Sequence, residues 1–112
     1  MKYLTVAVLA LCSFSGAQAA QTFTGVIADD MCAGVGHARM RMGPTDPECV
    51  KACVMYHDSK YVLEAATEAG TRVYALSDQK LPAQFPAQKV RVVGTLDAAT
   101  RTIQVESIVA AD

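Results

Sequence analysis

The chain has 112 residues, of which 10 are Lys or Arg and 11 are Asp or Glu, and its formal net charge is −1. This balance, without any basic run, argues against nucleic acid or an anionic membrane as the main partner. No segment approaches the roughly 18 consecutive apolar residues that a transmembrane helix needs, so we expect no membrane span.

Residues 1–19 predict a secretory signal peptide. Lys2 precedes an apolar run, Tyr3–Phe14, that is too short to span a bilayer. Ala17 and Ala19 then occupy the −3 and −1 positions of an A-x-A cleavage site. We therefore expect export, with a periplasmic or secreted location.

Cleavage after residue 19 leaves a mature chain, residues 20–112, that is long enough for one domain with its own core. Cys12 is removed with the signal peptide. A lipoprotein signal ending at Cys12 is an alternative that Leu11 disfavours, because a lipobox needs a small residue there. The mature chain keeps an odd number of thiols, which is unusual in an oxidising compartment: Cys32, Cys49 and Cys53.

The first half of the mature chain predicts a strand, a long loop and a helix. Residues 21–29 are rich in β-branched and aromatic side chains, which is typical of a strand. Residues 30–47 show no periodicity, and loops this long in small domains are usually functional or disordered. The helix is expected to begin within one residue of Asp46, with Thr45 or Asp46 as its cap, and to end near His57.

The second half predicts two hairpins. KYVLEAA and TRVYALS, joined by the turn TEAG, form the first. LPAQFPA, bounded by prolines, allows no more than a turn or a short helix. KVRVVGTLD and TIQVESIVA form the second, and Val90, Val92 and Leu96 alternate with basic residues as in a half-buried strand. One face of the first hairpin is expected to carry Tyr61, Leu63, Val73 and Ala75.

Five short strands, with a helical piece between the third and the fourth, follow the order of an OB-type barrel. The predicted fold is therefore mainly β with one helix: a small five-stranded OB-like barrel. The helix predicted near residues 46–57 is a different segment: it lies in an insertion, at about residues 30–58, between the first two strands. In such barrels this connection lies beside the ligand-binding face.

Several segments also resemble a known family in their order along the chain. They are TGVIADDMC, the following His37, CVKAC, KYVLEA, VYALSDQ and KVRVVGTLD. Together they resemble a family of small exported bacterial proteins of unknown function with OB-like strands, over nearly the whole mature chain, from about Thr22 to Val109. Asp58-Ser59 departs from the family, which has Gly-Ala before the lysine. The resemblance implies the fold and export, and it implies no activity.

Soft side chains are concentrated in the insertion. All three mature cysteines, both histidines and all four mature methionines lie between residues 31 and 57. Thiolate, imidazole and thioether are the ligands that late first-row metals prefer, and Cys with Met suits Cu⁺ in particular. The sequence therefore predicts a transition-metal site in this segment.

Helical geometry selects the candidate ligands. At 100° per residue, Cys49, Cys53 and His57 project from one face of the predicted helix. Cys49 lies in the first turn, where the helix dipole stabilises a thiolate. Cys32 and His37 on the facing loop would complete a tetrahedral Cys3His set with Cys49 and Cys53. The spacing C-x4-H-x11-C-x3-C is not that of a zinc finger.

Three further side chains are possible accessory ligands, and each has a plainer interpretation. Met40 and Met42 could supply thioethers or simply pack over the barrel. His57 could ligate or could interact with the helix dipole at the C-terminus. The adjacent carboxylates Asp29 and Asp30 at a strand end are interpreted as turn residues.

We predict a non-enzymatic exported protein that binds Zn²⁺ or Cu⁺ through Cys32, His37, Cys49 and Cys53. One alternative is an OB-like binding module for a protein or saccharide, in which a disulfide from Cys32 to Cys49 or Cys53 fixes the long loop and one thiol is spare. A second alternative is a periplasmic thiol redox protein with Cys49 as the attacking thiolate, although the cysteines lack C-x-x-C spacing.

Overall fold

The computed structural model describes residues 19–36 and 41–112, so nearly all of the predicted signal peptide lies outside the described residues. The predicted elements follow one another in the expected order. Within the described residues, no helix is both long enough and apolar enough to span a bilayer. The elements are β1 (Gln21–Asp29), α1 (Asp46–Tyr56), β2 (Tyr61–Thr67), β3 (Gly70–Leu76), the 3-10 helix η1 (Pro82–Gln84), β4 (Lys89–Asp97) and β5 (Thr102–Ala110).

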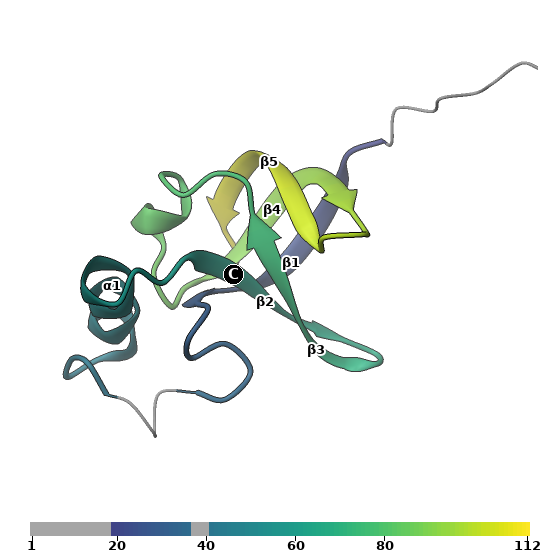
Figure 1. Cartoon of the computed structure of the whole chain (residues 1–112). Coiled ribbons are helices and arrows are strands. Elements are labelled where there is room, and N and C mark those ends of the chain that lie inside the picture. Colours follow the sequence, from purple (N-terminus) through teal and green to yellow (C-terminus); the bar gives the residue numbers. More distant parts are fainter. Residues whose placement is uncertain (1–18, 37–40) are drawn as a thin grey trace, which may run out of the picture.

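The five strands form one closed barrel in the order β1-β2-β3-β5-β4 (Figure 1). β1 closes the ring because its two halves pair with different strands: its first residues lie against β4 and its last against β2. All neighbours are antiparallel except β3 and β5, which pair in parallel over a short stretch. The mainly β, OB-like architecture predicted from the sequence is therefore confirmed.

The barrel core consists of inward-facing aliphatic side chains from every strand. The fully buried members are Ile27, Leu63, Val90, Val92 and Ile103. The alternation predicted for β4 is confirmed, with Val90 and Val92 buried and Leu96 packed against the core. Gly94 lies at the register shift between β4 and β5, where a Cβ atom would come within 2.2 Å of the Gln104 carbonyl oxygen. The strands can approach this closely only at a glycine.

The face predicted for the first hairpin is wrong by one residue on β3. The turn closes at the Thr67–Gly70 pair, and this register places Leu63 opposite Tyr74 rather than Val73. Directly paired residues share a face, so Tyr74 and Leu76 face the core, while Val73 and Ala75 face the other side. A shift of one residue exchanges the two faces of a strand, and here the two-residue turn sets the register.

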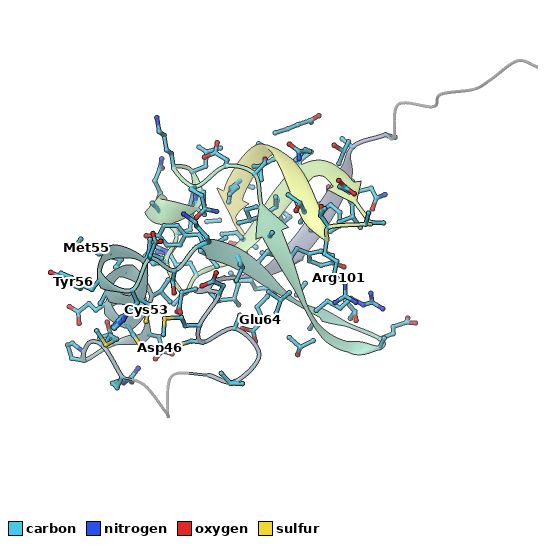
Figure 2. The ribbon with its side chains drawn as sticks, viewed as in Figure 1. Asp46, Cys53, Met55, Tyr56, Glu64 and Arg101 are labelled. Atoms are coloured by element: carbon cyan, nitrogen blue, oxygen red, sulfur yellow. The ribbon has the colours of Figure 1, made fainter. Side chains whose placement is uncertain are left out.

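Helix α1 begins and ends where the sequence predicts. The Thr45 hydroxyl caps it by accepting a hydrogen bond of 3.4 Å from the Glu48 amide. Val50 joins the barrel core, whereas Met55 and Tyr56 point away from the barrel and are 71% and 72% exposed (Figure 2). The helix lies at one end of the barrel, away from the turn between β2 and β3 (Figure 1).

Candidate metal centre

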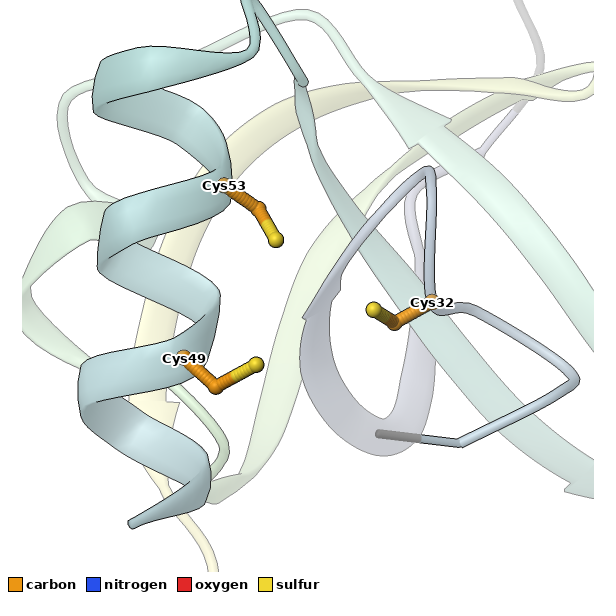
Figure 3. Close-up of side chains that lie close together, drawn as sticks. All are labelled: Cys32, Cys49 and Cys53. Atoms are coloured by element: carbon orange, nitrogen blue, oxygen red, sulfur yellow. The ribbon is translucent and has the colours of Figure 1, made fainter. Parts of the chain in front are cut away.

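Three cysteines from two segments of the insertion converge beside α1. Cys49 and Cys53 lie one turn apart on the helix, and Cys32 faces them from the turn after β1 (Figure 3). Their Sγ atoms all lie within 4.8 Å of one another. The three residues are at most 4% exposed, and none is disulfide-bonded in the described structure.

The turn after β1 positions Cys32. The amides of Cys32 and Ala33 donate to the Asp29 carbonyl at 3.2 and 2.9 Å, so the chain reverses as soon as the strand ends. The amide of Gly36 then donates to the Cys32 carbonyl at 2.9 Å. Gly34 and Gly36 have φ values of +81° and +76°, which glycine adopts without the strain that other residues incur. The local sequence thus directs the Cys32 side chain toward α1.

The N-terminal end of α1 provides polar contacts to Cys49. The Met42 amide donates to Cys49 Sγ at 3.4 Å, which is within the longer range of hydrogen bonds to sulfur. Arg41 forms an ion pair with Asp46 at 2.5 Å. This pairing raises the pKa of the Arg41 guanidinium, and the nearby Cys49 side chain acts in the same direction. A permanent positive charge therefore lies next to one of the three sulfurs.

A buried carboxylate, Asp29, lies beside the other two sulfurs. Asp29 is 0% exposed, and its Oδ2 accepts a hydrogen bond of 3.1 Å from the Cys32 amide. Its Oδ1 has no hydrogen-bond partner among the described residues. Buried carboxylate oxygens are normally paired, so an oxygen without a donor beside the thiols of Cys32 and Cys53 requires an explanation.

Burial and this carboxylate both disfavour ionisation of the neighbouring thiols. Desolvation raises the pKa of Cys53 to about 12, and the negative charge of Asp29 is the next cause. The pKa of Cys32 is raised for the same two reasons. In the absence of a cation both groups are therefore thiols at neutral pH, and a bound cation would favour their thiolate forms.

The donor set fits a thiophilic metal ion. Zinc–thiolate bonds of about 2.3 Å in a tetrahedral site place sulfurs about 3.8 Å apart. The cysteine sulfurs, within 4.8 Å of one another, need to approach by at most about 1 Å. That change is within reach of side-chain rotation, because Cys32 lies on a turn rather than on the barrel.

Among the predicted ligands, the structure brings together Cys32, Cys49 and Cys53. His37 and Met40 lie outside the described residues. Met42 is half-buried and packs against the three cysteines.

His57 is exposed at the C-terminus of α1. The mutually close ligand atoms in the described part of the chain include no histidine. This position of His57 agrees with its plainer interpretation as a residue at the end of the helix rather than as a ligand.

Two polar residues of this region were not identified as important from the sequence. The sequence predicts Asp29 as a turn residue, and its spacing of three residues before Cys32 is the signal for the contact between the two. Gln79 contacts the first residue of β2: its Oε1 accepts from the Tyr61 amide at 2.8 Å, and its Nε2 donates to the Tyr61 carbonyl at 3.0 Å. The side chain thus supplies the pairing that a neighbouring strand would otherwise provide.

A surface groove lies apart from the cysteines, on the outside of the barrel where β1 changes partner from β4 to β2. No cysteine contributes to it. Its lining residues are Thr24, Gly25, Val26, Glu64, Ala66, Thr71 and Lys89.

Comparison of the chain with protein-family models, with curated proteins and with solved structures finds no significant match. The functional argument therefore depends on the geometry of the three cysteines.

Proposed function

We propose that the protein is a small exported metal-binding protein that holds one thiophilic ion, Zn²⁺ or Cu⁺, through Cys32, Cys49 and Cys53. The observation that carries the proposal is the mutual approach of three buried Sγ atoms to within 4.8 Å. The signal-like segment at residues 1–19 supports export. Thiolate ligands suit both ions, and zinc sites with three cysteines are common.

The surroundings of Cys32 and Cys53 disfavour either of these two thiols as a redox nucleophile, a role that the redox alternative assigns to Cys49. A reactive cysteine needs a lowered pKa, because the thiolate is the attacking species. The pKa values of Cys32 and Cys53 are instead raised by burial. Such thiols react slowly with disulfides, whereas a metal ion that enters the site displaces their protons directly.

Native mass spectrometry of the full chain, expressed with its own N-terminal segment and recovered from the periplasm without chelator or reductant, tests the proposal. We expect loss of residues 1–19, a mass increase of one zinc or copper ion, and three alkylatable cysteines after the metal is stripped. A mass two hydrogens below that of the reduced, metal-free chain, with no metal adduct, would support the disulfide-containing module instead.

Single substitutions identify the ligands. Cys32→Ser, Cys49→Ser and Cys53→Ser should each weaken Zn²⁺ binding by at least about 100-fold, more than the loss typical of residues outside the ligand set. His57→Gln is the matched control, because it removes an exposed donor on the same helix. Unchanged affinity in the three serine variants would contradict the proposal.

A further inference from the structure

The three sulfurs leave the fourth position of a tetrahedral site to another group, and we propose that Asp29 Oδ1 supplies it. The resulting set of three thiolates and one carboxylate selects Zn²⁺ over Cu⁺. This inference rests on the proposed function and adds to it the fourth ligand and the metal.

The first step is the position and state of Asp29. The carboxylate is fully buried at the end of β1, three residues before Cys32. Its Oδ2 is held by the Cys32 amide at 3.1 Å, which leaves Oδ1 as the oxygen without a donor. In the described part of the chain, the other buried side-chain atom without a partner is the neutral hydroxyl oxygen of Ser59, whose burial costs less than that of a carboxylate oxygen.

The second step is proximity to the sulfurs. Asp29 accepts a hydrogen bond from the Cys32 amide, and its charge acts on both Cys32 and Cys53, so the carboxylate lies close to these two cysteines. Its oxygen is not one of the atoms within 4.8 Å of all the others. Ligation therefore requires the carboxylate to pivot toward the ion together with Cys32, to which it is hydrogen-bonded.

The third step is charge and ligand hardness. Three thiolates and a carboxylate carry four negative charges in a buried site. A divalent ion compensates two of them and a monovalent ion only one, and Arg41 adds no net charge because it is paired with Asp46. Carboxylate oxygen is also a good zinc ligand, whereas Cu⁺ prefers sulfur. Both effects favour Zn²⁺.

The test is a pair of competition titrations, with Zn²⁺ and with anaerobic Cu⁺, on the wild-type chain and on Asp29→Asn, which preserves the size of the side chain. We expect Asp29→Asn to lower Zn²⁺ affinity at least about tenfold more than Cu⁺ affinity, because it removes both the anionic oxygen and one charge. Ser59→Ala is the matched control, since it removes the other buried atom without a partner, and it should leave both affinities unchanged.

A parallel change in both affinities would overturn the inference, because a residue that only orients Cys32 affects both ions alike. Wild-type Zn²⁺ affinity in Asp29→Asn would also overturn it while leaving the proposed function intact. Failure of the wild-type chain to bind either ion, with a disulfide present, would remove both.

A second measurement needs no variant and therefore does not depend on the folding of Asp29→Asn. The wild-type chain loaded with ¹¹³Cd²⁺, a spectroscopic substitute for Zn²⁺, should show proton correlations to the β-protons of three cysteines and none to an imidazole ring. A correlation to an imidazole would assign the fourth position to a histidine and overturn the role of Asp29.

Discussion

The thiols of Cys32 and Cys53 are held in their protonated form by their surroundings. The main cause is the loss of water around the side chains, and the negative charge of Asp29 adds to it. A group whose pKa is higher in the folded than in the unfolded chain binds its proton more tightly when folded. Tighter proton binding therefore stabilises the folded state fully when the pH is below the pKa of the unfolded chain. This stabilisation is lost as the pH rises through the pKa of the folded chain.

The metal-free, reduced protein should consequently lose stability between about pH 9 and pH 12. These limits are the ordinary thiol pKa of 9.0 and the raised pKa of Cys53, about 12. Urea denaturation at pH 8.5, 9.5 and 10.5 should show a midpoint that falls steadily. The double variant Cys32→Ser/Cys53→Ser should show a weaker dependence, and an equally steep fall in that variant would mean that other groups are responsible.

Metal binding should show the opposite dependence on pH. Thiol ligands must lose their protons before they bind a cation, so apparent affinity rises with pH in proportion to the protons released. We expect Zn²⁺ affinity to increase from pH 6 to pH 8, measured by competition with a chelator of known proton dependence. A flat profile would show that the cysteines are not the ligands.

At the scale of elements, α1 is fixed at both ends and in its middle. Thr45 caps its first turn, Val50 anchors it in the barrel core, and Gln79 holds Tyr61, where the chain enters β2 after the helix. Gln79 Nε2 also donates to the Leu76 carbonyl at 3.1 Å, which ties the start of β2 to the end of β3. A glutamine outside the insertion therefore holds the strand that follows α1.

Gln79→Ala should destabilise the protein by about 1–3 kcal/mol, because the backbone N–H and C=O of the buried Tyr61 lose their partners. Gln84→Ala, in the exposed part of η1, is the matched control and should change stability little. Chemical denaturation measures both. Equal stability of the two variants would show that water replaces the Gln79 contacts.

At the scale of the molecule, the barrel and the insertion are stabilised differently. The barrel has a continuous ladder of strand pairs and an aliphatic core. The insertion contributes Val50 and the partly buried Val54 to that core, and it has a second, small cluster of Cys32, Cys49, Cys53 and Met42. Without a metal ion, the described part of the insertion therefore has a smaller buried apolar cluster than the barrel and is expected to open locally more easily.

Zn²⁺ should accordingly protect the insertion more than the barrel. Saturation at a free concentration 100 times the Kd adds about 2.7 kcal/mol to global stability. Hydrogen exchange should show the largest gain in protection in residues 30–36 and in α1, and a smaller gain in β4 and β5. Uniform protection of the whole chain, or no protection of α1, would contradict a site that joins α1 to the turn after β1. The control is Cys53→Ser with Zn²⁺, in which the gain in protection should be lost.

Much of the fold followed from local chemistry that the sequence displays directly. Periodicity of two residues located the strands, and Thr45 with Pro47 located the start of α1, because capping and strand alternation depend on near neighbours. The C-x3-C spacing placed Cys49 and Cys53 on one helical face for the same reason. The concentration of soft ligands between residues 31 and 57 predicted the segment in which the three cysteines meet.

Contacts between distant segments were decided only by the tertiary structure. The face of β3 depended on turn geometry, which sets a register that composition does not encode. The approach of Cys32 to α1 depended on how the turn after β1 folds back. Asp29 was predicted as a turn residue, and only the structure shows that it is fully buried beside Cys32, which follows it in the chain. Burial and charge at a site are sums over neighbours in space, and a linear sequence does not specify those neighbours.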